Sequence, residues 1–321
     1  MKRQVVFAAL IGTAALLGAG LAGCQRATQD DGKIVIGMTV PSLTHPFFIH
    51  LRDNVVDEAQ QLGVEVIAVD AEDVAAKQMS IVEDFIARRV DGVVISPIGA
   101  DTLVPAIEAL NKASIPVVTV DRKVSGGQVL VHVGADNVEG GRAAARFIVD
   151  QLAGKGRVIE LEGTPGASPA IDRKAGFHAV IDATDIEVIA SQTANFQRAN
   201  GQSVMENLLQ VHRDFQAVYA ANDEMMLGAI EAMEASKVDG AQVVTVGYDA
   251  IPDALSYVRA GRLDASVEQY PGRQAREALR LLVAHLRTGA RPETGELYIK
   301  PVVISAANLD EAEDKGVTRA Q

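Results

Sequence analysis

The chain has little cysteine, few aromatic residues and no tryptophan. Cys24 is the only cysteine among 321 residues, so a disulfide within the chain is excluded. Aromatic residues make up only 4% of the sequence, so the position of each is informative. Lys and Arg number 30 against 42 Asp and Glu, the formal net charge is −12, and no basic stripe occurs. This balance argues against a nucleic-acid-binding protein.

Long hydrophobic runs are missing after residue 24. The one at the front, 5–17, follows Lys2-Arg3 and leads to Leu21-Ala22-Gly23-Cys24. It is too short and too early for a membrane helix and is typical of an export signal. Its ending resembles the lipobox of bacterial lipoproteins. We therefore expect 1–24 to be a lipoprotein signal peptide, Cys24 to be lipidated, and 25–32 to be a tether that holds the protein at the outer face of the cytoplasmic membrane or in the periplasm. The alternative is a chance cysteine in an ordinary signal peptide.

Motifs of common enzyme classes are also absent. No G-x-G-x-x-G follows the first expected strand, and the sequence has no Walker A motif and no G-x-S-x-G. His45 and His50 are five residues apart, which does not place them on one helix face for zinc. We expect no metal, no cofactor and no catalytic residue, although Asp121 and Asp249 remain a possible carboxylate pair for a sugar enzyme.

The segment 216–233 shows the pattern on which the rest of the chain is built. Its apolar run 217–221 is typical of a strand buried on both faces. Asn222-Asp223 follows as a polar tip and N-cap, and a helical pattern begins there. The same order recurs along the chain. Strands are expected at 34–40, 64–69, 92–95, 117–120, 129–133, 158–161, 187–190, 243–246, 263–268 and 297–304. Helices are expected at 48–62, 78–88, 103–110, 137–152, 170–183, 197–210, 252–260 and 272–287.

This alternation predicts an α/β protein with parallel sheets. The length suits two domains, and we place a domain crossing at 134–137. Residues after 308 are expected to have no fixed structure.

Ligands of doubly wound folds bind beyond the carboxyl ends of the strands. Phe47, Phe48, Phe196, Tyr248 and Tyr270 lie at expected strand exits. An aromatic ring suits the apolar face of a sugar ring. The alternative is that these residues only cap the cores.

Polar side chains occupy the same exits. Asp121 and Arg122 could hydrogen-bond a ligand rich in hydroxyl groups, or could be a solvated ion pair. Asn222, Asp249 and Gln269 could do the same, or could be caps and turn residues. Two acids, one arginine and two amides suit a neutral sugar or polyol better than a phosphate or carboxylate.

These exits carry motifs that resemble those of the ribose-binding protein family, exported sugar-binding proteins that feed ABC importers. The resemblance covers about 33–308. The matching motifs are His-Pro-Phe-Phe at 45–48, Val-Asp-Arg at 120–122, Gly-Ala-Asp-Asn at 134–137, Ala-Asn-Asp-Glu-Met at 221–225, Gly-Tyr-Asp at 247–249 and Val-Glu-Gln at 267–269.

The resemblance implies a type I periplasmic binding protein with two doubly wound parallel-sheet lobes joined by a three-strand hinge. It implies an N-terminal lobe of 33–135 plus 270–298, a C-terminal lobe of 136–269 plus 299–321, and a monomer that binds a permease. The ligand-binding residues implied are Ser42, His45, Phe47, Phe48, Ser96, Asp121, Arg122, Arg173, Phe196, Asn222, Tyr248, Asp249 and Gln269.

Three positions depart from the ribose pattern. Ile171 stands where ribose binders have an arginine, which is found here at Arg173, and His45 and Ser96 each replace an asparagine. The sequence Ile-Asp-Arg-Lys at 171–174 is similar to that of galactofuranose binders, and the C-terminal third is similar to that of myo-inositol binders. The resemblance thus implies a sugar or polyol and leaves open which one.

Other functions remain open from the sequence. A transcription regulator can share this two-lobe sensor, but it carries a helix-turn-helix where this chain has a signal sequence. A receptor that presents a sugar or autoinducer to a membrane sensor is the main alternative to transport.

Overall fold

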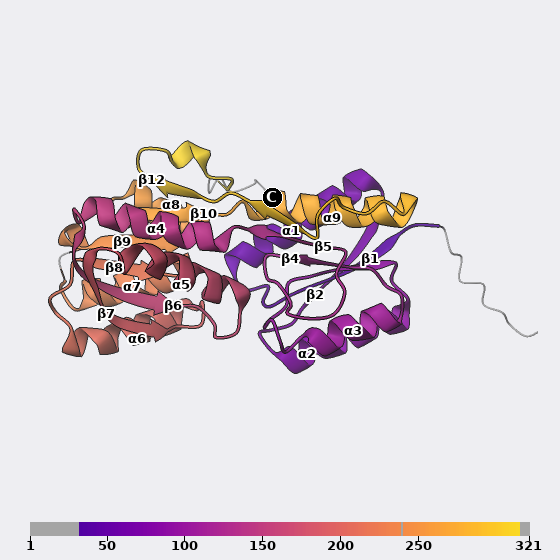
Figure 1. Cartoon of the computed structure of the whole chain (residues 1–321), viewed down its shortest axis with the longest axis horizontal. Helices are drawn as coiled ribbons and strands as arrows, with labels where there is room; N and C mark the ends of the chain where they lie inside the picture. Colours follow the sequence, from indigo (N-terminus) through magenta and orange to yellow (C-terminus); the bar gives the residue numbers. More distant parts are fainter. Residues whose placement is uncertain (1–31, 239, 315–321) are drawn as a thin grey trace, which may run out of the picture. The chain divides into compact units, whose positions relative to one another are not determined.

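Two six-stranded sheets, each with helices on both faces, make up the described part of the chain (Figure 1). The structure is a computed structural model and describes residues 32–238 and 240–314. The expected signal peptide with Cys24, and nearly all of the expected tether, lie outside these residues. Within the described ranges, no helix has the length and apolar character needed to cross a membrane.

The first sheet has the strand order β11-β5-β4-β3-β1-β2. Its strands are β1 (Val35–Val40), β2 (Glu65–Asp70), β3 (Gly92–Ile95), β4 (Val117–Val120), β5 (Val131–Ala135) and β11 (Glu296–Ile299). One face is covered by α1 (Pro46–Leu62) and α9 (Pro271–Thr288), the other by α2 (Ala75–Arg88) and α3 (Val104–Lys112). Consecutive residues of β3 therefore enter opposite cores: Val93 packs with Phe85 of α2, and Val94 with Leu279 of α9. Burial on both faces explains the unbroken apolar runs.

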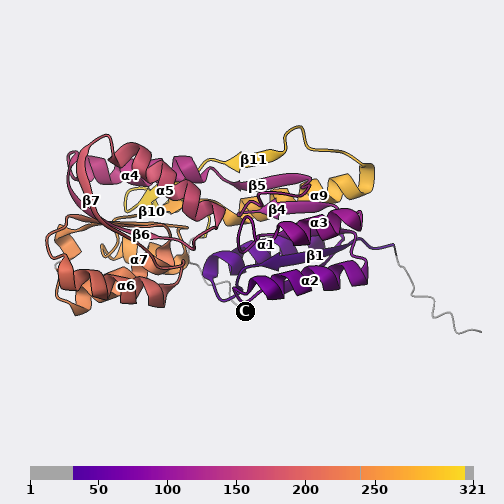
Figure 2. The same ribbon diagram turned by 60° about the horizontal axis from the view of Figure 1, so that its bottom comes forward.

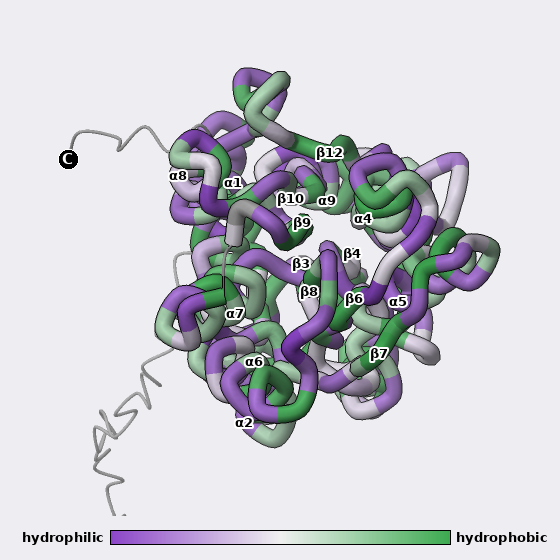
Figure 3. Tube along the Cα trace, turned by 90° about the vertical axis from the view of Figure 1, so that its left-hand side faces the viewer, coloured by the Kyte–Doolittle hydropathy of each residue, from purple (hydrophilic) through white to green (hydrophobic). Residues whose placement is uncertain are grey.

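The second sheet has the order β12-β10-β9-β8-β6-β7. Its strands are β6 (Lys155–Glu162), β7 (Asp185–Thr193), β8 (Ala217–Ala220), β9 (Val244–Tyr248), β10 (Ala265–Glu268) and β12 (Val302–Ser305). Helices α4 (Asn137–Gln151) and α5 (Ser168–Ile181) cover one face, and α6 (Arg198–Val211), α7 (Asp223–Ala235) and α8 (Pro252–Arg259) the other. Figure 3 shows hydrophobic colour at β9 and β12.

Within the described residues the chain passes between the two sheets three times. It passes from β5 to α4, from β10 to α9, and from β11 to β12. Figure 2 shows β11 beside β5, with which it pairs in parallel register. Each passage is only a few residues long, so the two lobes are joined by short connections at one side of the fold.

The expected single strand at 297–304 is wrong. The structure breaks it into β11 and β12, which belong to different sheets. Pro301 lies at the break, and a proline has no N–H to donate to a strand ladder. Strand β12 pairs antiparallel with β10, so this edge strand departs from the parallel arrangement of the rest of its sheet.

The expectation of a loose tail after 308 is wrong for the residues up to 314. A short 3-10 helix, η2 (Leu309–Glu311), begins there, and Ala312 is buried. The carboxylate of Glu313 accepts hydrogen bonds from the Gly272 N–H at 2.6 Å and from Arg276 at 2.9 Å. These partners lie on α9, so charged residues that look solvated in the sequence are fixed by pairing.

Candidate functional site

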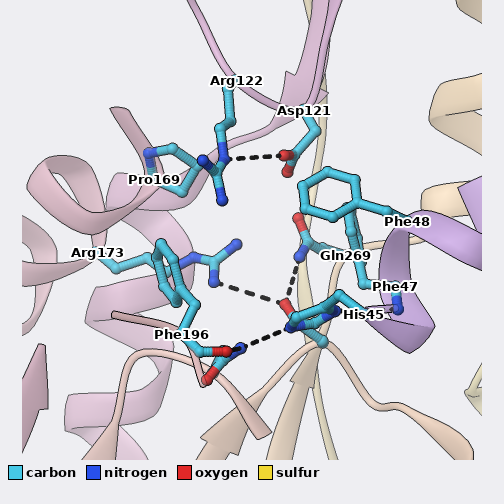
Figure 4. A pocket seen from close by; sticks show the side chains of 11 residues that line it. His45, Phe47, Phe48, Asp121, Arg122, Pro169, Arg173, Phe196 and Gln269 are labelled. Atoms are coloured by element: carbon cyan, nitrogen blue, oxygen red, sulfur yellow. Dashed lines mark hydrogen bonds and ion pairs between the residues drawn. The ribbon is translucent and has the colours of Figure 1, made fainter. Parts of the chain in front are cut away.

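A cavity lies where the carboxyl ends of strands from the two sheets face each other (Figure 4). It holds about 270 Å³ of space between the atoms, part of which is open to solvent. Ten of the thirteen residues expected at the site line it, together with Pro169. The lining consists of His45, Phe47, Phe48, Asp121, Arg122, Pro169, Arg173, Phe196, Asn222, Asp249 and Gln269.

Aromatic rings approach the cavity from both lobes. Phe47 and Phe48 lie in the first turn of α1, with ring centroids 5.1 Å apart in an edge-to-face arrangement. Phe196 comes from the loop before α6, and Figure 4 shows it on the side opposite Phe48. A Cβ at Gly163 would lie 2.0 Å from the Phe196 ring, so only glycine leaves room for this ring position. Tyr270, expected with this group, caps α9 and is not part of the lining.

Asp121 and Arg122 follow β4 directly and are both buried, so the alternative of a solvated ion pair is wrong. The Arg122 Nε lies 3.8 Å from Asp121 Oδ2, to which the Ser96 hydroxyl also donates at 3.3 Å. Burial raises the pKa of Asp121, although the neighbouring arginines oppose the shift. The Arg122 guanidinium is 5.4 Å from the Phe48 ring centroid and 5.5 Å from that of Phe196, so it bridges the two aromatic walls.

Arg173 is held by α5 and has little freedom. Its Nε donates to Asn137 at 2.8 Å, its Nη1 donates to the Ala221 carbonyl at 2.6 Å, and its guanidinium stacks on Tyr248 at 3.6 Å. The Nη1 also lies 3.5 Å from the Asp249 carboxylate. A Cβ at Gly141 of α4 would lie only 2.1 Å from the Arg173 carbonyl oxygen. The close approach of α4 and α5 therefore sets where this arginine enters the cavity.

The exchange at Ile171 does not bear on the cavity. Ile171 is 57% exposed and is not part of the lining, whereas Arg173 is buried and lines it. Both residues lie on α5, two positions apart, and so point in different directions. Arg173, which the resemblance implied as a ligand-binding residue, is thus the member of this pair that reaches the cavity.

Asp249 and Gln269 follow two neighbouring strands, β9 and β10. The Gln269 amide donates to Asp249 Oδ1 at 2.6 Å. Burial raises the pKa of Asp249 to about 7, although Arg173 opposes the shift. Asp249, Asp121 and Phe196 all adopt positive φ, at 108°, 62° and 61°. Such conformations are costly for residues other than glycine and cluster at ligand sites, and no sequence pattern had indicated them.

His45 and Asn222 meet across the cavity, which the sequence did not predict. His45 is the N-cap of α1, and Asn222 is the N-cap of α7. The sequence had predicted the cap only for Asn222. The His45 Nε2 lies 2.9 Å from the Asn222 Nδ2. Burial and, to a lesser extent, three nearby arginines lower the pKa of His45 to about 3, so the imidazole is neutral.

Three expected residues do not line this cavity. Ser42 lines a second cavity beside it, Ser96 supports Asp121, and Tyr248 lies under Arg173 with its hydroxyl donating to Asn137 at 3.3 Å. Pro169 does line it. This residue had no signal in the sequence beyond a proline in the first turn of a helix.

The chain is similar to known proteins over most of its length. Residues 36–290 match a family model described as a periplasmic binding protein domain. The ribose import binding protein of Bacillus subtilis (strain 168) is 43% identical over 249 residues, which are 77% of this chain and 80% of that protein. The galactofuranose-binding protein of Escherichia coli (strain K12) is 33% identical over 267 residues, 80% and 84% of the two chains.

Solved structures agree with this fold. The Caulobacter myo-inositol binding protein bound to myo-inositol aligns with a TM-score of 0.84 at 35% identity, and the alignment covers 88% of this chain and 97% of that one. A family match over more than half of the chain and relatives of this identity point to the same protein class. The chain therefore belongs to the periplasmic binding protein family, has its two-lobe type I fold, and is a binding protein and not an enzyme.

Proposed function

We propose that this protein captures a neutral monosaccharide or cyclic polyol between its two lobes and delivers it to an ABC importer. The observation that carries the proposal is a small cavity with aromatic walls whose polar lining offers both donors and acceptors. A sugar ring has two apolar C–H faces and a rim of hydroxyl groups, so it matches both features.

The polar groups favour hydroxyl groups over a charged ligand. Two guanidiniums, of Arg122 and Arg173, face two carboxyl groups, of Asp121 and Asp249. A hydroxyl group both donates and accepts, so it can use both kinds of partner. Hydrogen bonds to charged groups contribute roughly 1.5–3 kcal/mol each. An anionic ligand would have to lie beside the two carboxyl groups.

The relatives support the same chemical class. Those compared above are named for binding ribose, galactofuranose and myo-inositol. All three are neutral and carry hydroxyl groups around a small ring. We therefore propose a ligand of the ribose-like pentose, galactofuranose or myo-inositol class.

We further propose that the protein is exported and held at the membrane by a lipid on Cys24, as a monomer. The support is the sequence around Cys24, and the soluble lobes would then lie near the permease. Cys24→Ser should move the protein from the membrane fraction to the soluble fraction of fractionated cells. Unchanged membrane retention would exclude the lipid anchor and leave the binding proposal standing.

The test of the binding proposal is calorimetric titration of the Cys24→Ser protein with ribose, galactose, galactofuranose, xylose, allose, erythritol and myo-inositol. We expect micromolar or tighter binding of one of them, with the sugar recovered unchanged. Asp121→Asn should remove most of that binding, while Asp101→Asn, on an exposed turn of the same lobe, should not. No binding by a folded sample would overturn the proposal.

A further inference from the structure

His45 and Asn222 each make hydrogen bonds within their own lobe, apart from the contact between them. The Phe47 N–H donates to His45 Nδ1 at 3.2 Å. The Met225 N–H donates to Asn222 Oδ1 at 3.0 Å, and Asn222 Nδ2 donates to the Phe196 carbonyl at 3.2 Å. All three bonds are local to one lobe, so they persist whether the lobes are open or closed.

These local bonds fix which atoms carry hydrogen. A neutral imidazole has one N–H, and its other nitrogen accepts. Since His45 Nδ1 accepts from Phe47, the hydrogen lies on Nε2. Asn222 presents its Nδ2, which is also a donor, to this nitrogen at 2.9 Å. Two donors therefore face each other across the cavity.

No rearrangement of hydrogens removes the conflict. If the imidazole hydrogen moves to Nδ1, it opposes the Phe47 N–H. If the Asn222 amide turns over, its NH₂ opposes the Met225 N–H and the Phe196 carbonyl loses this donor. A second proton on His45 would add a further donor, and burial holds the pKa of this residue at about 3. Each of these arrangements leaves one donor against another, which is unfavourable in a partly buried site.

We propose that His45 and Asn222 form a specificity gate: the lobes close fully only around a ligand that presents an oxygen acceptor to both nitrogens. A hydroxyl or ring oxygen has two lone pairs and can accept from His45 Nε2 and Asn222 Nδ2 together. The inference rests on the proposed function, because it names the ligand group that this part of the site selects. A CH₂ or an ammonium group at the same place offers no acceptor and is rejected.

The gate also connects ligand recognition to closure. An oxygen that bonds both nitrogens holds them further apart than 2.9 Å and replaces their mutual repulsion by two hydrogen bonds. Closure without the oxygen carries the donor–donor conflict. The pair therefore favours an open protein until an acceptor is in place.

The first test needs no sugar. Asn222→Asp keeps an oxygen that caps α7, and its second oxygen accepts from His45 Nε2, so the conflict between the lobes becomes a bond. The variant also loses the bond to the Phe196 carbonyl, but that bond lies within one lobe and its loss affects the open and closed forms alike. We expect the ratio of closed to open protein to rise roughly tenfold or more. The ratio is measured from spin-label distances between Lys112→Cys and Glu206→Cys, exposed positions on the two lobes, in the Cys24→Ser protein. An unchanged ratio in a folded sample would overturn the gate.

A matched background separates the gate from a general effect of the added charge. In the His45→Phe protein, Asn222→Asp has no imidazole N–H to accept and should not raise the closed fraction. An equal rise in both backgrounds would mean that the nearby arginines attract the new carboxylate, and it would overturn the gate.

Two further measurements use the unmodified pair. Ring-¹⁵N spectra should show His45 protonated at Nε2 and bare at Nδ1, its signal being identified by its loss in His45→Gln; a proton on Nδ1 would overturn the proposal. The second measurement compares analogues of the sugar that binds. At one position of its ring, both the deoxy and the amino analogue should bind ~10-fold or more weakly than the parent sugar. In the His45→Phe protein, the same analogues should lose much less affinity. If no sugar binds, the proposed function fails, while the closure and tautomer results still decide on the gate.

Discussion

The backbone N–H of Lys123 donates a 2.8 Å hydrogen bond to the hydroxyl of Ser168, and this bond joins the two lobes beside the cavity. Nearby, the Ala100 N–H donates to the Gly166 carbonyl at 3.1 Å, and the Lys123 ammonium lies 3.5 Å from Asp172. None of these contacts involves the cavity lining. They stabilise the closed arrangement independently of which ligand is bound.

Asp172→Asn should weaken ligand binding modestly, because it removes the Lys123–Asp172 pair from the closed form only. Both side chains are about one-third exposed, so the effect is small, about two- to fivefold in affinity. It should fade as salt rises. Calorimetry at low and high salt checks this.

Asp182→Asn is the control for Asp172→Asn. It caps the C-terminal end of α5 and pairs with His178, within its own lobe. We expect no change in affinity from this variant at either salt concentration. Equal losses in the two variants would show that lobe closure is not what Asp172 supports.

Gly163→Ala should weaken sugar binding about tenfold or more, although residue 163 is not in the cavity lining. Its new Cβ would overlap the Phe196 ring, which must move, and a displaced ring loses its contact with the sugar. Gly240→Ala is the matched control, because nothing lies within 4 Å of the Cβ there. Titration calorimetry gives both affinities.

The Phe196→Ala background tells whether the ring carries the effect. With no ring to displace, Gly163→Ala should then cost little additional affinity. If the loss is as large in this background, the substitution acts through the backbone and not through Phe196.

Asp121→Asn should lower sugar affinity by roughly 10- to 150-fold, because it replaces a charged acceptor by a neutral amide in a dry site. The shape of the side chain is kept, and the Ser96 hydroxyl can still donate to the amide oxygen. We therefore expect the protein to stay folded, as checked by its circular dichroism and melting temperature. Normal affinity in a folded Asp121→Asn protein would exclude this carboxylate from the site.

Much of this site could be predicted because the chain repeats one arrangement. A buried strand such as β4 ends in Val120, and Asp121 follows at the edge that the parallel strands share. The apolar runs and the alternation of strands with helices locate each strand end from its own local sequence. The sequence could not tell how the two lobes meet, because the contact between His45 and Asn222 joins positions 177 residues apart.

The incorrect predictions also arise from contacts between residues far apart in the sequence. An apolar stretch that continues through Pro301 looks like one strand, and only the sheets decide that it is two. The tail looked solvated because charge predicts exposure unless partners are known, and the partners of Glu313 lie on α9 and β10. Pro169 was missed because a proline in the first turn of a helix is common, and only the placement of α5 brings it to the cavity lining.

His50 of α1 lies 3.3 Å from Asp314 and 3.7 Å from Glu313, so it ties the end of the described chain to the first lobe. Burial alone would lower the pKa of His50, but the nearby carboxylates of Asp314 and Glu313 outweigh burial and raise the pKa to about 9. The folded protein therefore holds this proton more tightly than the unfolded chain, whose histidine has a pKa of 6.5. The resulting stabilisation is fully present below pH 6.5 and is lost as the pH rises through 9.

We therefore expect the free energy of unfolding of the Cys24→Ser protein to exceed that of its His50→Gln variant by about 1–2 kcal/mol at pH 6, after allowance for partial exposure. The difference should shrink to near zero by about pH 9.5. Urea unfolding of both proteins across this range measures it, and taking the difference cancels the titration of groups that they share. His212→Gln, on the other lobe, controls for the loss of a histidine as such. A difference that stays constant with pH would mean that His50 packs against the tail without holding a proton for it.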